Sequence, residues 1–597
     1  MSPTFAAPQV QAARTTDGAL LIRSTASLPE RIPPVVHAFR AGAQAHPDRL
    51  LVAQRDGDAW VSRTWGEVRR EVDGFAQWLI DEGHAELPVM ILSGASHLHL
   101  VATLAAMTLG IPVAPVSVAY SLQSHDHAHL RRIAQMLGRA TVVAEDSNFL
   151  EALSAIGRPP AVVTSNGQID GSVALADVTR TAPSGQVDAR CDALRHDTVA
   201  KVMFSSGSTG EPKGILNTHG MLAVNQAQMR AVWPFLADER PILLDWLPWS
   251  HTFGGNHNLN MVLTNGGSLW LDDGRPAPHL IQRTVRNLAD ARPTLYFSVP
   301  AGYAALLPHL EGNPAAARAL LDRLRLAFFA GAALPQPLWD RMEKLAADHG
   351  SPMRMTTSWG LTETAPAATS AHFATTRSDC IGVPLPGVEL KLIPVEERYE
   401  VRVRGPIVTP GFLQRPDLTV DAFDADGFLR TGDAVSFADP KDPAQGLIFS
   451  GRLAEDFKLS TGTFVHVGAV RVALIAASNG LITDAVICGH DGAEVCALVW
   501  LAPEHAERCD PHAGPDEGLR RELLDVIDRA SARGGPSQSV RRVLVLPDPP
   551  DLEAGEITDK GYVNQRAVRD RRAADVALLA RDPVSQLVVS LDGREGP

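Results

Sequence analysis

The chain has 597 residues, of which 45% are hydrophobic and 21% charged, and its formal net charge is −13. This composition is typical of a folded globular protein with several lobes and excludes a largely disordered chain. The acidic balance argues against non-specific binding to nucleic acid or to an anionic membrane surface, because both need a basic face.

Cysteine usage and the apolar runs bear on the compartment. The five cysteines are scattered, with no Cys-x-x-Cys pair, which favours a reducing environment. The chain does not open with a basic segment followed by an apolar one, so we expect no signal peptide and a cytoplasmic location. The most apolar run, residues 98–118, contains Gly110, Pro112 and Pro115 and predicts a helix, a turn and a buried strand instead of a membrane span.

The first half of the chain alternates between two hydrophobic periods. Residues 1–30 show no period and predict a loose arm. Apolar residues then recur at helical spacing from Trp65 onward. Expected helices at 98–109 and 129–137 alternate with expected strands, and this alternation predicts mainly parallel sheets covered by helices. The expected strands cover residues 89–92, 111–116, 141–144, 199–204, 243–247, 295–299 and 326–329.

The pattern changes near residue 400 to shorter β-rich pieces, such as 400–404 and 446–450. Beyond 451, expected strands at 485–489 and 495–501 and a helix at 517–530 predict a compact α+β lobe. We therefore predict an α/β protein in three parts. They are an arm (1–30), a large N-terminal domain (31–451) of layered, mainly parallel sheets flanked by helices plus a β-rich subdomain, and a small C-terminal α+β domain (452–597).

A glycine-rich loop follows the expected strand 199–204. Its glycines let successive backbone N–H groups turn toward anionic oxygens, its hydroxyls add donors, and its lysine adds a charge suited to phosphate. Its spacing is not that of a Walker loop. A flexible surface turn is the alternative reading of such a composition. The residues concerned are Ser205, Ser206, Gly207, Ser208, Thr209, Gly210 and Lys213.

Four further clusters would complete a nucleotide site with Mg²⁺. The small residues Gly331, Ala332 and Ala333 allow a flat base to lie against the backbone. The run from Trp359 and Gly360 to Thr362 and Glu363 offers a ring for stacking, a hydroxyl and a carboxylate able to hold Mg²⁺. Asp433, on an expected tight turn, is suited to accept hydrogen bonds from ribose hydroxyls, and Arg452 adds a cationic group at the domain boundary.

These blocks, in this order, resemble the superfamily of adenylate-forming enzymes, which includes acyl-CoA synthetases, peptide-synthetase adenylation domains and luciferases. The resemblance covers roughly residues 35–570. It implies that the glycine-rich loop holds the β and γ phosphates of ATP, that Gly331 and Ala332 border adenine, and that Thr362 and Glu363 serve the α-phosphate and Mg²⁺. It also implies that Asp433 and Arg452 bind ribose, and that the C-terminal domain is mobile.

Three segments resemble feruloyl-CoA synthetases more narrowly: residues 245–256, 451–464 and 555–566. This match implies a hydroxycinnamate, an aromatic carboxylic acid, as substrate and coenzyme A as acceptor. The family places a gate between the acid pocket and the coenzyme A tunnel at the position of His251. A flat aromatic acid needs an apolar slot, with packing as the alternative for Phe253 and Tyr303. The candidates to line it are Phe253, Asn256, Tyr303, Gly331 and Trp359.

The resemblance also assigns roles to the C-terminal domain. Lys560 is the candidate for the lysine of the adenylation step, although an alternative alignment places Glu556 there. Lys458 is expected to approach the acid site after the domain rotates. Relatives often carry Asp or Lys at the pivot of that rotation, whereas this chain has Ala454, so the identity of the pivot stays open.

Several functions compete with a feruloyl-type ligase. A fatty-acid or benzoate CoA ligase belongs to the same superfamily. A non-catalytic acyl-AMP binder belongs to a different class, and the presence of Lys213, Glu363 and Arg452 argues against it. A peptide synthetase is disfavoured because no carrier domain follows residue 570.

Overall fold

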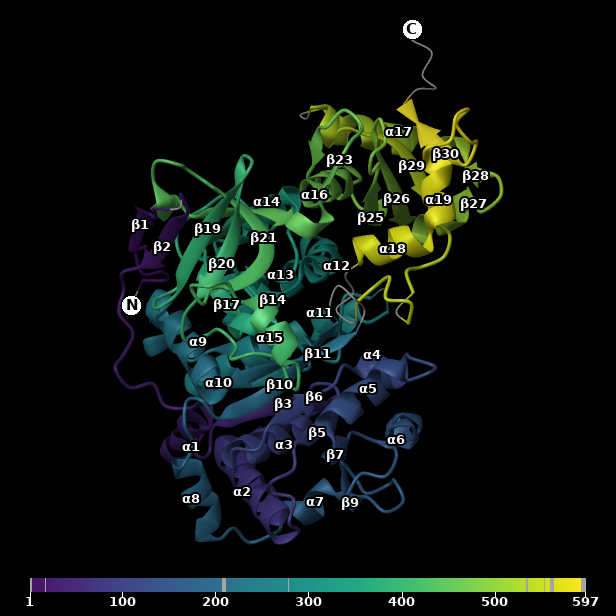
Figure 1. Ribbon diagram of the computed structural model, residues 1–597. Coiled ribbons are helices and arrows are strands. Elements are labelled where there is room, and N and C mark those ends of the chain that lie inside the picture. The colour runs from purple at the N-terminus through teal and green to yellow at the C-terminus, as the bar shows by residue number, and fades with distance from the viewer. Residues whose placement is uncertain are drawn as a thin grey trace.

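The computed structural model describes residues 3–16, 18–206, 211–277, 279–532, 535–551, 553–558 and 563–591. A large body contains the purple to green part of the chain, and a smaller lobe contains the yellow-green C-terminal part (Figure 1). Among the described residues, none of the helices combines the length and apolar character that a bilayer-spanning segment needs.

A seven-stranded sheet forms the first layer of the body, in the order β11-β10-β6-β5-β7-β8-β9. All neighbouring strands are parallel except β10 and β11, which form an antiparallel hairpin. The strands are β5 (Val89–Leu92), β6 (Val113–Pro115), β7 (Thr141–Ala144), β8 (Val162–Thr164), β9 (Val173–Ala174), β10 (Val199–Ser206) and β11 (Pro212–Thr218).

A second, 15-stranded sheet begins with a largely parallel half that continues the body. Its strands β3, β13, β12, β14, β15 and β16 run parallel, and only β4 at the edge is antiparallel. The bounds are β3 (Leu50–Asp56), β4 (Ala59–Thr64), β12 (Ile242–Asp245), β13 (Ser268–Leu271), β14 (Leu295–Ser298), β15 (Leu326–Phe329) and β16 (Arg354–Gly360).

Helices separate and cover the two sheets. One core joins a middle layer of helices to facing strands of both sheets. These helices are α1 (Val35–Ala45), α2 (Trp65–Asp81), α3 (His97–Thr108), α9 (His219–Val232) and α10 (Leu259–Thr264). The local sequence fixes where α2 starts, because Thr64 and Glu67 each accept a hydrogen bond from the other's backbone N–H in a capping box.

Two further helix layers close the outer faces. On the seven-stranded sheet lie α5 (Ala128–Leu137) and α6 (Leu150–Ile156). On the parallel half of the larger sheet lie α11 (Ile281–Ala291), α12 (Pro300–Glu311), α13 (Pro314–Leu321) and α14 (Gln336–Asp348). Shorter connecting helices are α4 (Val118–Leu122), α7 (Leu175–Val178), α8 (Gly185–Asp192) and α15 (Pro416–Ala422).

The antiparallel half of the larger sheet forms the β-rich end of the body. It comprises β17 (Ala367–Ser370), β18 (Cys380–Pro384), β19 (Glu389–Val395), β20 (Arg398–Arg404), β21 (Leu429–Phe437) and β22 (Leu447–Arg452), with β1 (Val10–Arg14) and β2 (Leu20–Ser24) at its edge. The prediction of a loose arm over 1–30 was therefore wrong. Strand β2 pairs with β19 in register, so Ile22 lies opposite Leu390 and is 1% exposed.

The C-terminal lobe has its own sheet, in the order β25-β26-β29-β30, and its own apolar clusters. The strands are β25 (Ile482–Cys488), β26 (Val495–Leu501), β29 (Val540–Val545) and β30 (Val588–Ser590), with short pairs β23 (Phe457–Lys458) with β24 (Phe464–Val465) and β27 (Cys509–Asp510) with β28 (Gly514–Pro515). The helices are α16 (Val467–Ala477), α17 (Glu517–Ser531), α18 (Gln565–Arg571) and α19 (Ala573–Leu579).

The connection between body and lobe runs through β22 and a short 3₁₀ turn, η6 (Leu453–Glu455). Just after this turn, the Asp456 carboxylate accepts a hydrogen bond from Arg398 Nη2 at 2.5 Å, and Arg398 lies on β20 of the body. Its other oxygen accepts from the N–H of Val467 at the start of α16. Asp456 thus ties the first residues of the lobe to both sides, while Ala454 is exposed.

The predicted α/β class with a smaller C-terminal α+β part is confirmed. Most expected elements agree with the structure within one to three residues, including β5, β7 and β26. The predicted strand 243–247 ends earlier, at Asp245, because the Asp245 carboxylate accepts a hydrogen bond from the N–H of Leu247 and turns the chain.

The packing of β2 yields a prediction on stability. Ile22→Ala leaves a cavity against β19, so we expect the free energy of unfolding to fall by about 3 kcal/mol. Leu21→Ala, on the same strand but half-buried, should cost clearly less. Urea unfolding of both variants measures the difference. Equal, small losses would contradict the packed edge strand.

Candidate functional site

Three of the sequence blocks follow neighbouring parallel strands of the larger sheet. His251 comes after β12, Gly331 after β15, and the run from Thr362 to Glu363 after β16. Strands β12, β14, β15 and β16 run in the same direction, so the segments that follow them lie at one edge of the sheet. Ligand sites of α/β proteins are found at this carboxyl edge.

Asp433 lies on β21 and is joined to the end of β16 by a hydrogen bond. Its Cα partner across β21 and β22 is Arg452, and the Arg452 Nε lies 3.6 Å from Asp433 Oδ1. Asp433 Oδ2 accepts a hydrogen bond from Trp359 Nε1 at 2.9 Å. The Asp433 side chain is 5% exposed, whereas that of Arg452 is 63% exposed. The structure thus joins three residues that are far apart in the sequence.

Trp359 differs from its expected role. The sequence favoured its ring as a stacking surface, but the ring is 7% exposed and belongs to the body's core. Its N–H group instead fixes one oxygen of Asp433. The strand β16 turns its large apolar side chain inward, which leaves Gly360 and the following turn at the edge.

The second oxygen of Asp433 differs from the first in its hydrogen bonding. Asp433 Oδ1 is buried and accepts no hydrogen bond within the described part of the chain. Burial raises the pKa of this carboxyl, and the Glu363 charge raises it further, while Arg452 and the Trp359 hydrogen bond lower it. An unsatisfied buried acceptor beside a guanidinium suits a ligand with neighbouring hydroxyl donors, and a ribose has them.

The turn that carries Thr362 and Glu363 is held by a backbone hydrogen bond to Thr409. It is the 3₁₀ segment η4 (Thr362–Thr364), in which Thr362 is 8% exposed and Glu363 half-buried. The carbonyl of Glu363 accepts from the N–H of Thr409. Gly360 lets the backbone of β16 lie close to the Pro366 carbonyl oxygen, because a Cβ at this position would lie 1.8 Å from that oxygen.

The glycine-rich loop connects β10 to β11. Ser205 and Lys213 are register partners at the loop end of this hairpin. Residues 207–210, which contain Gly207, Ser208, Thr209 and Gly210, lie outside the described residues, as does the side chain of Ser206. Beside the loop, Glu211, Lys213, Arg415 and Leu418 line a hollow of about 360 Å³, large enough for a triphosphate group.

A buried pair of asparagines joins this hairpin to the other blocks. Asn217 on β11 accepts a hydrogen bond from Asn256 Nδ2 at 2.7 Å. Its own Nδ2 donates to the Thr362 carbonyl at 3.1 Å. Sequence reasoning missed Asn217, although a polar side chain amid the apolar residues of β11 was a usable signal.

His251 begins the segment that leads into a π-helix, η3 (Phe253–Asn258). His251 is 8% exposed, and its carbonyl accepts from the Gly255 N–H. Behind it, the half-buried Phe253 ring packs against Phe328, with ring centres 5.6 Å apart. Tyr303, by contrast, is 3% exposed and donates its hydroxyl to the Phe328 carbonyl, so it is a packing residue and not a wall of an open slot.

The segment from Gly331 to Ala333 forms a loop after β15. Gly331 has φ +89°, a left-handed conformation that favours glycine, and is exposed. Ala332 is half-buried and Ala333 exposed. Small side chains therefore border the carboxyl edge here, as a flat base would need.

The C-terminal lobe carries two predicted lysines. Lys560 lies outside the described residues. Lys458 is exposed, and its Nζ lies 4.4 Å from the centre of the Phe464 ring on the β23–β24 hairpin. Glu556, the alternative to Lys560, is 0% exposed and receives two hydrogen bonds from Arg572. It is committed to that ion pair, which disfavours the alternative alignment.

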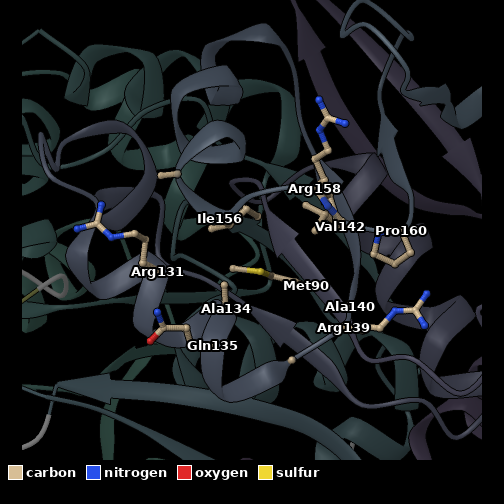
Figure 2. Close-up of a pocket in the computed structure, with 13 residues that line it drawn as sticks. Met90, Arg131, Ala134, Gln135, Arg139, Ala140, Val142, Ile156, Arg158 and Pro160 are labelled. Carbon is tan, nitrogen blue, oxygen red and sulfur yellow. The ribbon is translucent and has the colours of Figure 1, made fainter.

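A separate pocket of about 380 Å³ opens between α5, α6 and the seven-stranded sheet (Figure 2). Arg131, Arg139 and Arg158 surround an apolar floor that includes Met90 and Val142. It lies at the amino ends of β7 and β8, whereas the glycine-rich loop follows the carboxyl end of β10 in the same sheet. It is therefore distinct from the site above.

Solved structures share this architecture. The anthranilate CoA ligase AuaEII, in complex with anthranoyl-AMP, matches with a TM-score of 0.72 at 19% identity, covering 91% of this chain and 98% of that one. A benzoate CoA ligase from Burkholderia xenovorans LB400 matches with a TM-score of 0.69 at 19% identity, covering 90% and 99%. The fold is that of adenylate-forming enzymes.

Residues 39–413 match the model of the family described as AMP-binding enzyme, and the chain belongs to that family. A long-chain-fatty-acid–CoA ligase, FadD15 of Mycobacterium bovis, is 24% identical over 89% of this chain and 94% of its own length. The anthranilate–CoA ligase of Pseudomonas aeruginosa is 30% identical over 56% and 62%. The family and these relatives support an acyl- or aryl-CoA ligase activity that passes through an acyl-adenylate.

Adenylate-forming enzymes use ATP, Mg²⁺ and coenzyme A. The residues present fit the nucleotide's ribose and the metal. Asp433 Oδ1 is an unsatisfied acceptor at the expected ribose position, and the Glu363 carboxylate lies near enough to Asp433 to affect its pKa. A single carboxylate suffices for Mg²⁺ that is also bound by phosphates and waters.

The Asp433 geometry predicts a pH-dependent affinity for ATP. The ionised carboxylate accepts hydroxyl donors, and its pKa is raised, so affinity should fall as the pH drops through that raised pKa, above the usual range of aspartate. Asp433→Asn should weaken ATP binding about 10-fold or more at neutral pH and remove this acid limb. Titration calorimetry with ATP at several pH values measures both effects.

The matched control is Asp348→Asn, an exposed carboxylate of α14 paired with Lys344. It should leave ATP affinity unchanged. Wild-type affinity in Asp433→Asn would remove Asp433 from the nucleotide site.

Proposed function

We propose that the protein is an ATP-dependent carboxylic acid:CoA ligase that acts on ferulate or a related hydroxycinnamate. The observation that carries the nucleotide part of this proposal is Asp433, whose one oxygen is fixed by Trp359 while the other is unsatisfied beside Arg452. A cytoplasmic location goes with the proposal, because all five cysteines are free thiols.

The reaction has two steps. In the first, a carboxylate oxygen of the acid attacks the α-phosphorus of ATP, the bond to the β-phosphate oxygen breaks, and pyrophosphate leaves. In the second, the sulfur of coenzyme A attacks the acyl carbon, the thiol gives up its proton, and AMP leaves with the electrons of the broken C–O bond. Charge develops on phosphoryl oxygens in the first step, so positioned donors and cations do the catalytic work.

The site residues divide this work. Thr362 and Glu363 serve the α-phosphate and the metal, and Mg²⁺ neutralises charge on the phosphate oxygens when it is bound. The loop from Ser205 to Lys213 holds the outer phosphates, with Ser206 and Thr209 as hydroxyl donors. Gly331, Ala332 and Ala333 border adenine, and Gly360 gives the backbone room at the α-phosphate.

The lobe divides the two steps in time. We propose a large domain at 31–451 and a small one at 452–597, with Lys560 acting on the bridging oxygen in the first step. A rotation near Ala454 then brings Lys458 toward the acid site for thioester formation. The exposed position of Ala454 in the short η6 turn is compatible with such a pivot.

An aromatic acid is favoured over an alkyl chain by the rings behind His251. Phe253 is half-buried. Its ring meets those of Phe297 and His257 edge-on and is tilted against that of Phe328. An aromatic substrate ring can join such a cluster with favourable edge-to-face contacts. The narrower resemblance of residues 245–256 to feruloyl-CoA synthetases supports the same class.

Two alternative functions can be distinguished from a feruloyl-type ligase by experiment. A fatty-acid or benzoate CoA ligase shares every nucleotide contact and differs only in the acid slot. A non-catalytic acyl-AMP binder would bind the adenylate without exchanging pyrophosphate into ATP.

The two lysines predict opposite losses in the two half-reactions. Lys560→Ala should abolish acid-dependent pyrophosphate exchange but leave thioester formation from supplied feruloyl-AMP largely intact. Lys458→Ala should impair thioester formation and spare exchange. Measuring both half-reactions in both variants provides matched controls, and normal exchange in Lys560→Ala would transfer the adenylation role to another residue.

The acid slot is tested by a substrate panel with Phe253→Ala. Wild-type enzyme with Mg²⁺ and coenzyme A should prefer ferulate, 4-coumarate and caffeate over benzoate, anthranilate and octanoate. Phe253→Ala should raise the KM for hydroxycinnamates about 10-fold and leave the KM for ATP unchanged. A preference for octanoate in the wild type would favour the fatty-acid alternative, and failure of every acid to drive exchange would favour the non-catalytic binder.

A further inference from the structure

A buried lysine lies beneath the site and takes no part in the roles described so far. Lys201, on β10, is 2% exposed. Within the described part of the chain no carboxylate pairs with it, and its Nζ donates to the Gly255 carbonyl at 2.6 Å. Burial lowers its pKa to about 7. Burying an ammonium without a counter-ion costs stability, so stability alone does not explain this side chain.

The acceptor belongs to the π-helix η3, which follows His251. Side chains from outside hold three consecutive carbonyls of this helix. Lys201 donates to the Gly255 carbonyl, and Gln226 Nε2 on α9 donates to those of Asn256 and His257, each at 3.2 Å. The packing leaves no room for error, because a Cβ on Gly255 would lie 2.2 Å from the Trp249 carbonyl oxygen.

Lys201 also lies in register with Asn217 across the β10–β11 hairpin. The two cross-strand neighbours hold consecutive residues of η3: Lys201 the carbonyl of Gly255, and Asn217 the side chain of Asn256. Along the chain, Lys201 is four residues before Ser205, where the glycine-rich loop begins, and Gly255 is four residues after His251. One hydrogen bond therefore joins the strand that leads to the phosphate loop to the helix that follows the acid gate.

We propose that Lys201 is a positioning residue for the adenylation step, which holds η3, and with it His251 and the bound acid, against the strand that carries the phosphate loop. The inference rests on the proposed ligase function. The acid's carboxylate oxygen and the α-phosphorus have to lie about 3–3.5 Å apart with the right orientation, and a misplacement of about 1 Å can cost about 100-fold in rate. In its ammonium form Lys201 is a charged donor, which provides a stronger link than a neutral one, and it lies on β10, the strand that leads to the loop.

The test compares three variants. Lys201→Met removes the donor but keeps the length and apolar stem. Lys201→Arg keeps a cationic donor. Lys391→Met is the control, because Lys391 is also a buried strand lysine but lies on β19 and pairs with Asp426 at 2.6 Å. The measurements are kcat and KM for acid-dependent pyrophosphate exchange, the melting temperature, and hydrogen exchange of the η3 amides.

For Lys201→Met we expect kcat to fall about 10- to 100-fold with the KM for ATP within about twofold, and η3 amides to exchange faster. The melting temperature should stay equal or rise, because methionine removes a buried charge. Lys201→Arg should recover part of kcat. Lys391→Met should melt earlier, with unchanged kcat and unchanged η3 exchange. A merely structural lysine would instead lose melting temperature and activity together.

Wild-type kcat and η3 exchange in Lys201→Met would overturn the inference. If that variant fails to fold, Lys201→Gln gives the same comparison with a shorter, neutral donor, and wild-type kcat in it would count against the role of the charge. The hydrogen-exchange arm separates the two proposals. If the η3 amides of Lys201→Met exchange hydrogen faster but the wild type activates no acid, the ligase function is refuted and the link is retained. If the wild type catalyses pyrophosphate exchange and Lys201→Met has wild-type kcat and wild-type hydrogen exchange in η3, the link alone is refuted.

Discussion

The side chain of Asn217 connects the two sheets of the body, and the geometry of the site depends on this connection. The glycine-rich loop belongs to the seven-stranded sheet, whereas His251, Thr362 and Asp433 belong to segments of the larger one. Asn217 uses its oxygen for Asn256 and its nitrogen for the Thr362 carbonyl, so one buried amide contacts both the π-helix that follows His251 and the turn that carries Glu363. Buried amides hold such a position firmly, because breaking either bond leaves a polar atom unsatisfied.

Asp433, unlike Asn217, has a buried side-chain oxygen without a hydrogen-bond donor in the described part of the chain. Trp359 fixes one carboxylate oxygen, and the other has a guanidinium near but accepts no hydrogen bond within the described residues. Burying this unpaired oxygen lowers the stability of the folded protein, and a hydrogen bond from a bound ribose would offset the loss. Part of the free energy of ribose binding would then come from Asp433. Arg452, mostly exposed, is the last residue of β22, where the chain leaves the sheet and enters the η6 turn.

Features that depend on neighbouring residues in the sequence could be predicted, whereas contacts between distant segments could not. Helix and strand positions followed from local periodicity, and β5, β7 and β26 match the expected bounds. The motif blocks identified Asp433, Arg452 and Thr362, but not that Trp359 would turn inward to orient Asp433, because spacing does not show which face a strand buries. Asn217 and the edge strand β2 were missed for a related reason, since the contact of Asn217 with Thr362 and the pairing of β2 with β19 both join residues more than 100 positions apart.

The lobe connection contains an ion pair that the proposed domain rotation has to break. Asp456 is nearly buried and pairs with Arg398 of the body, and His466 Nδ1 lies 3.3 Å away on the lobe side. A rotation about residues 453–455 separates Asp456 from Arg398, and separating a buried pair costs about 3–5 kcal/mol unless both charges reach water. Because η6 lies immediately before Asp456, the same rotation that breaks the pair also exposes it. The Asp456–Arg398 pair is therefore a local barrier to the proposed domain movement, and this barrier is lower where both charges reach water.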